Sequence, residues 1–435
     1  MRSLSSTLTT AQKELSAGPI WKVVLSRAAQ STRAYDNSRI SKISHVDMPS
    51  GDYSEIHLRN YDGALTSLDF EHYQAVISYG YNTKVSRSAW VASSTYSVDD
   101  IVIPTSANTN GYQYRCSVAG TVAGTEPTWP TALGVTVANS SVTWEMDGNS
   151  GEEYSRSAPL RVRVQELHSG RGILKCILRV EGIFKQLVED KGESRYTQES
   201  SNTATAQTII TSIAGASLTP YTNYTAYTVT YDSTDGIINT FVPAEYFFVQ
   251  LNDNRDDKIQ ELLDYTGCKR RPQNDGQIHI FDPVTTGTAY NYEYKFNVAG
   301  DHNFWGESVR LRFVEPNREI VTSPSTDSPI YAGTATSATS YALAPKTRTT
   351  ERRLTSTAQA SSIASALIER DELDAEIGFA TVPMNAGQEL WDYIKVTDSR
   401  MGGTTRVGNI QYIQRDVEVY PDSRPLTWQM RISLG

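Results

Sequence analysis

The stretch from Trp90 to Trp144 constrains the fold more than any other part of the chain. Three of the seven tryptophans fall within it, at positions 90, 129 and 144, among short runs of β-forming residues. These runs are interrupted by Asn110-Gly111 and by further Gly and Pro residues, which are the residues that tight turns between strands require. The pattern predicts a small all-β module.

The sequence on either side of this module predicts strands of a larger sheet. Residues 73–79 have β character, residues 161–165 alternate strictly, and residues 173–180 return after a turn that contains two glycines. Insertion of one module into another is tolerated at surface loops whose ends lie close together. We therefore predict that residues 88–147 are inserted into a first β-barrel domain made of residues 1–87 and 148–190.

Length and composition favour several domains that are mostly β. A chain of 435 residues is too long for one hydrophobic core. Its 25 tyrosines, together with abundant Ser and Thr, suit half-buried pleated surfaces. We predict a mostly β fold with a few short helices, in which antiparallel β-barrels carry the small inserted module.

The remaining segments complete this plan. Apolar residues at positions 4, 8, 11 and 15 predict a short N-terminal amphipathic helix. Residues 191–320 alternate between helical and β patterns and are interpreted as a middle α+β domain. Residues 315–350 are rich in Ser, Thr, Ala and Pro and are expected to form a long loop or linker. Residues 321–435 are then interpreted as linker, a helix that begins with a capping box at Ser356, and a C-terminal β-barrel domain.

Charge and cysteine content argue against several classes of partner. The net charge is −9, and no run of Lys and Arg is longer than residues 269–271, so sequence-specific nucleic-acid binding is not expected. The three cysteines show no metal or redox spacing. The N-terminus lacks the apolar core of a signal peptide, and no run approaches 18 apolar residues, so membrane insertion is not expected either.

The sequence contains no recognisable catalytic motif. Nucleophile elbows, phosphate-binding loops, dinucleotide fingerprints and zinc-binding helices are all missing from it, and its six histidines are scattered. With 49 acidic residues, spacing alone nominates no pair of catalytic carboxylates. We predict a protein that is not an enzyme and that needs neither cofactor nor metal.

The aromatic residues of the insert suggest a carbohydrate-binding surface. Flat aromatic faces stack on the C–H groups of sugar rings, and the candidates are Trp129, Tyr112 and Tyr114. Trp129 lies in a Pro-Thr-Trp-Pro loop and is expected to be the most exposed, followed by Tyr112. The alternative is that these aromatics fill the core of a module with few aliphatic residues, as is expected of Trp90 and Trp144.

The insert resembles the chitin-binding-type modules found within bacteriophage tail proteins. The resemblance rests on the order of four stretches: a Trp-x5-Tyr opening, a Val-Asp-Asp segment, a Gly-Tyr-x-Tyr-x-Cys strand and a Gly-Thr-Glu-Pro-Thr-Trp-Pro centre. It implies a carbohydrate-binding-like module that faces outward, with host cell-surface polysaccharide as an expected partner.

The rest of the chain resembles the tail-hub, or baseplate hub, proteins of long-tailed phages. The stretches that carry this resemblance are the N-terminal helix before a strand and residues 259–267, 274–280, 382–398 and 406–410. It implies a homotrimer with two tail-tube-like β-barrels per subunit, arranged as a ring below the hexameric tube. The implied partners are the tail tube or distal tail protein, the tape measure protein and a central tail spike or fibre. The implied location is the virion tail tip, assembled in the host cytoplasm.

Three functions are therefore compared. The first is a structural hub at the tail tip. The net negative charge of the chain suits a channel through which DNA must pass, because such a channel should not bind phosphate tightly. The second is a glycan-binding adhesin, a receptor-binding tail protein in which the insert is the active part. The third is a tail-associated lysin. A trimer with apolar interfaces favours the first, binding of polysaccharide by the insert favours the second, and turnover of a cell-wall or capsule polymer favours the third.

Overall fold

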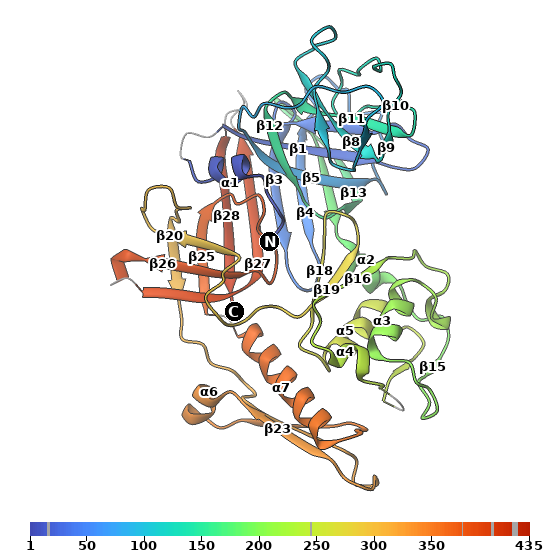
Figure 1. Ribbon diagram of the computed structural model, residues 1–435, viewed down its shortest axis with the longest axis vertical. Coiled ribbons are helices and arrows are strands. Elements are labelled where there is room, and N and C mark those ends of the chain that lie inside the picture. The colour runs from blue at the N-terminus through green and yellow to red at the C-terminus, as the bar shows by residue number, and fades with distance from the viewer. Residues whose placement is uncertain (15–17, 244–245, 376, 402–403, 420–424) are drawn as a thin grey trace.

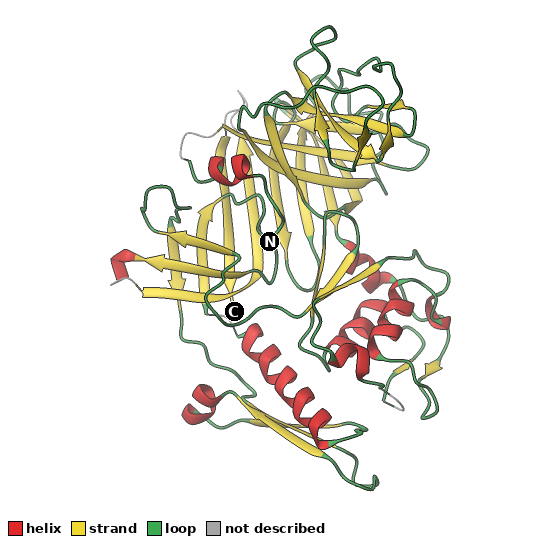
Figure 2. Cartoon of the chain, in the orientation of Figure 1, coloured by secondary structure: helices red, strands yellow, loops and turns green. Residues whose placement is uncertain are grey.

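The computed structural model describes the chain except for residues 15–17, 244–245, 376, 402–403 and 420–424 (Figure 1). The predicted mostly β fold is confirmed, because strands make up 40% of the chain and helices 15% (Figure 2). No helix among the described residues is long and apolar enough to cross a lipid bilayer.

One sheet of fourteen strands organises the molecule, and its first half is built from the N-terminal 181 residues. β12 (Glu152–Arg156) pairs with part of β5 on this side of the sheet. The other strands follow one another in the order β2 (Arg33–Asp36), β1 (Gly18–Ser26), β5 (Gln74–Asn82), β13 (Leu160–Gly170), β14 (Ile173–Glu181), β4 (Tyr53–Arg59) and β3 (Ile40–Asp47).

The second half of the sheet comes from the C-terminal part of the chain. Its strands are β27 (Thr404–Val419), β28 (Pro425–Leu434), β25 (Gly378–Pro383) and β21 (Gly306–Val309), with β26 (Tyr393–Asp398) and β20 (Tyr292–Lys295) attached beside β27. A bridge between Tyr294 and His302 brings β20 close to the segment before β21, so these strands curve around one core. Thus β20 and β21, which fall within the expected middle domain of residues 191–320, belong instead to the C-terminal sheet.

The two halves meet edge to edge. β3 and β27 pair antiparallel from Asp47 opposite Ile413 to Lys42 opposite Glu418. Their apolar faces form one continuous core, in which the ring centroid of Trp428 lies 5.6 Å from that of Trp21. Each half would otherwise expose an unpaired strand edge, so the pairing removes two edges at once.

Residues inserted between β5 and β12 form a sheet and a hydrophobic core of their own at the top of Figure 1. Its tight turns include Gly111 at a φ of 82°, a left-handed conformation that glycine adopts without strain. The four-stranded sheet follows the order β10 (Thr136–Asn139), β11 (Val142–Asn149), β8 (Tyr112–Val118) and β7 (Ile101–Val102), and β6 (Thr95–Tyr96) pairs with β9 (Gly120–Thr121).

A helical region follows the first half of the main sheet. Asn254 caps α5, since its side chain accepts a hydrogen bond of 2.7 Å from the Asp257 amide. The helices are α2 (Ile183–Glu189), α3 (Ala206–Ala214), α4 (Ile237–Thr240) and α5 (Arg255–Leu263), and the strands are β15 (Tyr196–Thr197), β16 (Val229–Asp232), β17 (Phe248–Val249), β18 (Lys269–Pro272) and β19 (Ile278–Phe281).

The predicted N-terminal helix is α1 (Ser6–Ala11), which buries Leu8 and Ala11, while position 15 lies outside the described residues.

The linker expected over residues 315–350 is wrong. This segment forms β22 (Arg318–Thr322), β23 (Ala332–Thr336), α6 (Ala338–Leu343) and β24 (Thr347–Glu351), packed against α7 (Thr357–Asp374). Its Ser and Thr side chains occupy largely exposed positions, and α7 supplies most of the apolar contact, so the segment itself has little hydrophobic character. The predicted N-cap at Ser356 is confirmed, because its side chain accepts from the backbone N–H of Gln359 at 3.1 Å. The Gln359 side chain reaches back to the backbone N–H of Thr355 at 2.8 Å, one residue before the position that a capping box uses.

Candidate functional site

The aromatic residues predicted to bind sugar are mostly part of the core of the insert. Trp129 is 8% exposed, which contradicts the expected exposure of its loop, and Tyr114 is fully buried. Their ring centroids lie 4.2 Å apart, and Trp129 also packs edge-on against Trp144 at 5.9 Å. Tyr112 is half-buried and packs against the same cluster. These three residues do not form an exposed stacking platform.

Hydrogen bonds explain why the Trp129 loop turns inward. The indole N–H of Trp129 donates to Glu126 at 2.7 Å, and the same carboxylate accepts from the amide of Thr105 at 2.8 Å. The Tyr114 hydroxyl donates to the Pro130 carbonyl at 2.7 Å. In a small module with few aliphatic residues, aromatic side chains with satisfied polar ends are the main source of buried area.

A buried network of charges fixes the insert to the first half of the main sheet. Lys22 of β1 contacts Asp147 of β11 at 2.7 Å, and Asp147 contacts Arg115 of β8 at 3.2 Å. Arg115 also contacts Glu145 at 2.9 Å. Lys22, Asp147 and Arg115 are each at most 5% exposed. Burial alone would raise the pKa of Asp147, but Lys22 and Arg115 outweigh it and hold that pKa well below the usual carboxyl value.

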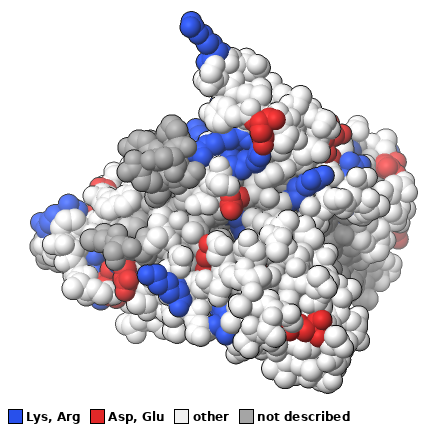
Figure 3. All heavy atoms as spheres, turned by 90° about the horizontal axis from the view of Figure 1, so that it is seen from above, with Lys and Arg blue, Asp and Glu red and all other residues white. Residues whose placement is uncertain are grey.

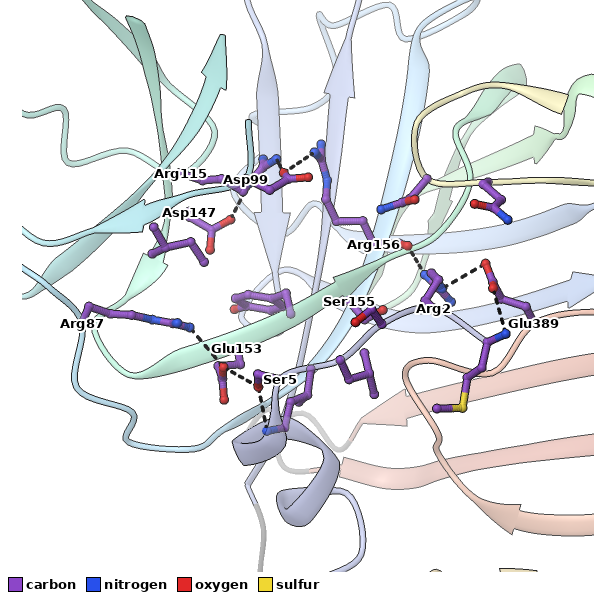
Figure 4. Close-up of a pocket in the computed structure, with 18 of the residues that line it drawn as sticks. Arg2, Ser5, Arg87, Asp99, Arg115, Asp147, Glu153, Ser155, Arg156 and Glu389 are labelled. Atoms are coloured by element: carbon purple, nitrogen blue, oxygen red, sulfur yellow. Dashed lines mark hydrogen bonds and ion pairs between the residues drawn. The ribbon is translucent and has the colours of Figure 1, made fainter. Parts of the chain in front are cut away.

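A cavity of about 500 Å³ lies beside this network, where the insert, the N-terminal segment and β12 meet (Figure 4). The side chains of Arg87, Arg115 and Arg156 approach it from different elements. The carboxylate of Asp99 lies between Arg115 and Arg156, and that of Glu153 lies beside Arg87. Its lining is therefore strongly polar, unlike the apolar pockets that hold most small ligands.

A second buried charge cluster lies at the junction of the two halves of the main sheet. Arg415 of β27 is fully buried, forms an ion pair with Asp47 of β3, and donates to the Gln388 carbonyl at 2.7 Å. His45 lies 3.0 Å from the other oxygen of Asp47. Burial by itself would raise the pKa of Asp47, but Arg415 and His45 lower it far below its ordinary value.

Asp52 is a buried carboxyl group of this cluster whose charge is poorly compensated. It is 3% exposed, and its Oδ1 has no hydrogen-bond partner among the described residues. Burial and then repulsion from Asp47 raise its pKa well above the usual value. A carboxyl group with a raised folded-state pKa costs stability as the pH rises from about 4 through that pKa, because the unfolded chain ionises over this range while the folded protein resists ionisation.

We therefore expect Asp52→Asn to raise the free energy of unfolding at pH 8 by on the order of 1 kcal/mol, and to have much less effect at pH 4. Urea denaturation of the wild type and the variant at the two pH values measures this difference. Asp69→Asn, which changes an exposed carboxylate of the same half of the sheet, should be neutral at both. If Asp52→Asn instead lowered the free energy of unfolding equally at pH 4 and pH 8, that result would contradict the raised pKa assigned to Asp52.

An exposed segment with alternating apolar side chains continues from the end of β21, at the free end of the main sheet. Val309, Leu311 and Phe313 alternate with Arg310 and Arg312, and every residue from 308 to 313 is exposed. Leu311 is 92% exposed. Within the described chain, β21 is hydrogen-bonded to β25 alone, and β2, at the opposite end of the strand order, is bonded to β1 alone. Exposed edges with apolar side chains are typical sites of contact with another chain.

Charges on the face seen from above are mixed. Figure 3 shows Lys and Arg interspersed with Asp and Glu over a mostly uncharged surface, and this face carries no continuous basic stripe of the kind that binds a nucleic acid backbone. In the part of the chain that the structure describes, no group of three or more His, Cys, Asp or Glu side chains is arranged to hold a metal ion.

The fold is similar to that of the tail protein from Neisseria meningitidis MC58. The likeness covers 96% of both chains, with a TM-score of 0.55 and 9% sequence identity. The chain shares the fold of a tail protein. The 43 kDa tail protein of prophage MuSo2 from Shewanella oneidensis matches over 95% of this chain and 98% of its own, with a TM-score of 0.47 and 11% identity. No family model and no curated protein matches the sequence.

Sequence reasoning missed both buried charge clusters. One signal was available for the first, because Lys22 interrupts the otherwise apolar run from residue 20 to 25. A charged residue in a buried strand requires a partner, but nothing in the sequence identifies Asp147, which is 125 residues away, as that partner. The Arg415–Asp47 pair spans 368 residues and gave no comparable signal.

Proposed function

We propose that this protein is a structural component of a phage tail tip, in which three copies form a hub ring that joins the tail tube to a central spike or fibre. The observation that carries the proposal is the edge-to-edge joining of two curved sheets in one chain, in a fold shared with a tail protein over nearly its whole length. Because each chain contains two curved half-sheets, three chains would supply six of them. This number matches the sixfold symmetry expected of a tail tube. The proposal places the protein in the virion and assigns it no catalytic activity.

The free ends of the main sheet support this assembly. β2 and β21 are the first and last strands in the order of the main sheet, and they present different surfaces. If the β21 end of one copy contacts the β2 end of the next, the contact is head-to-tail. A head-to-tail contact closes into a ring when its rotation allows. The apolar side chains beside β21 would then be buried against the next copy.

Replacing Leu311 with aspartate tests this interface. Because Leu311 is 92% exposed, Leu311→Asp should leave the fold of the subunit intact, while a charge buried in the interface should shift the protein from trimer to monomer. Sedimentation velocity at matched concentrations measures the shift. A loss of about 3 kcal/mol at each contact would raise the dissociation constant of that contact by roughly 100-fold.

Leu251→Asp is the matched control, since Leu251 is 54% exposed after β17 in the helical region, away from the segment beside β21 (Figure 1). It should leave the trimer unchanged. Dissociation by both variants, or by neither, would contradict the assignment of the interface to the segment beside β21.

The adhesin alternative requires a surface other than the predicted one. Trp129 and Tyr114 are core residues, so the stacking of sugars on them has no support from their burial. The proposed partners remain the tail tube or distal tail protein, the tape measure protein and the spike or fibre, with the insert on the outside of the ring.

A further inference from the structure

The small sheet of β16, β19 and β18 joins the helical region to the main sheet (Figure 1). On one face of β19, Ile278 and Ile280 belong to the core of the helical region, and on the other face Phe281 packs against the core of the main sheet. His279 alternates with the two isoleucines along the strand, so it lies on the same face as Phe281. A change at His279 therefore acts at the joint between these two parts of the molecule.

Both ring nitrogens of His279 contact carboxylates. Nδ1 lies 2.6 Å from Asp232 at the end of β16, and Nε2 lies 2.9 Å from Asp275 in the turn between β18 and β19. A neutral imidazole has a single N–H, so it can donate to only one of these acceptors, whereas the protonated ring donates to both. The observed geometry therefore matches the imidazolium form.

The charges around His279 favour this protonated form. The ring is buried, while the side chains of Asp232 and Asp275 are 48% and 39% exposed. Arg271 lies opposite His279 on β18, but its guanidinium is paired with the carboxylates of the segment 389–392. Burial by itself would lower the pKa of His279, but the hydrogen bonds and charges of Asp232 and Asp275 outweigh it and raise that pKa.

The strand β16 has few other attachments. In the described part of the chain, its backbone is paired with β19 alone, over four residue pairs. Thr230 Oγ1 donates to the Gln277 side chain at 2.8 Å, and the Tyr231 hydroxyl donates to a carbonyl of α3 at 3.0 Å. The contact between Asp232 and His279 is thus one of a small number that hold the end of β16 in place.

We infer that His279 is a pH-dependent switch at this joint: the imidazolium ties β16 to the turn between β18 and β19, and loss of its proton releases one of the two carboxylates and loosens β16 from β19. Because the folded-state pKa of His279 is raised, the tie is fully present below about pH 6.5 and is lost as the pH rises through that folded-state pKa. Loosening of β16 would uncover the edge of β19. The switch does not depend on the oligomeric state of the protein.

Nuclear magnetic resonance of the histidine-labelled full chain tests the titration. The chain has six histidines, and His279→Gln identifies the signal of His279 by its loss. The titration midpoint of His279 should lie above about 6.5. Asp275→Asn should lower this midpoint because it removes one negative charge. An amide oxygen can still accept from the backbone N–H of Gln277, so this variant should keep the turn.

Hydrogen exchange of the backbone amides of β16 tests the structural response. Their protection factors, which are corrected for the intrinsic effect of pH on exchange, should fall about threefold as His279 loses its proton, because ion pairs of this exposure are worth little more. His279→Gln should show the lower protection at every pH. His168→Gln, which changes an exposed histidine of β13, should behave as the wild type does.

The inference is overturned if His279 titrates at or below about 6.5, or if the protection of β16 does not change as His279 loses its proton. If His279→Gln does not fold, Asp275→Asn takes its place, and the loss of protection should then begin at a lower pH than in the wild type. The same pH for that loss in Asp275→Asn and in the wild type would also overturn the inference.

Discussion

Replacing Arg415 with methionine is expected to lower the free energy of unfolding by about 3–5 kcal/mol at pH 7. Arg415 is fully buried between the two halves of the main sheet, and its removal leaves the carboxylates of Asp47 and Asp52 without their principal cation. The Gln388 carbonyl also loses its donor. Urea denaturation followed by circular dichroism measures the loss.

The pH dependence of this loss distinguishes a charge effect from a packing effect. In the wild type, the depressed pKa of Asp47 provides stability that is fully present above about pH 4 and is lost as the pH falls further. The difference between wild type and Arg415→Met should therefore hold above about pH 4 and shrink as the pH falls below it. Arg431→Met on the neighbouring strand β28 is the control, because Arg431 is exposed and should cost less than about 1 kcal/mol. A deficit for Arg415→Met that is independent of pH would contradict the charge-based explanation.

Asp147→Asn is expected to release the insert from the main sheet. The change leaves Lys22 and Arg115 buried without the carboxylate that joins them, a loss of about 3–5 kcal/mol. Because the insert has its own sheet and core, we expect it to stay folded while its connections to β5 and β12 become accessible. Limited proteolysis should then cut the variant near residues 83–90 much faster than it cuts the wild type.

The matched control for this experiment is Asp99→Asn. Asp99 contacts the same arginine at 3.0 Å, but it is 54% exposed, so its loss should cost less than about 1 kcal/mol and leave the cleavage rate unchanged. Equal cleavage of the two variants would contradict the view that the buried Lys22–Asp147 contact anchors the insert.

Local patterns in the sequence predicted much of the fold. The cap at Ser356 depends only on side chains within four residues of the helix start, and it is present. The alternation of residues 161–165 and 173–180 predicted the hairpin of β13 and β14. These features need no information from distant parts of the chain.

The features that define the candidate sites depend instead on contacts between distant residues. The pairing of β3 with β27 joins residues about 370 positions apart, and the Asp47–Arg415 pair forms only after this register is set. Trp129 was predicted to be exposed from its Pro-flanked loop, but Glu126, three residues earlier, draws its indole inward. The cavity combines residues from 1 to 389, so its arginines have no common signal in the sequence.

The mass of the purified protein in solution, measured by light scattering over a range of concentrations, tests the central proposal most directly. The hub ring predicts a species of three times 48.2 kDa, which Leu311→Asp converts to the mass of a single chain. A mass of 48.2 kDa at every concentration would contradict a ring formed by this chain alone.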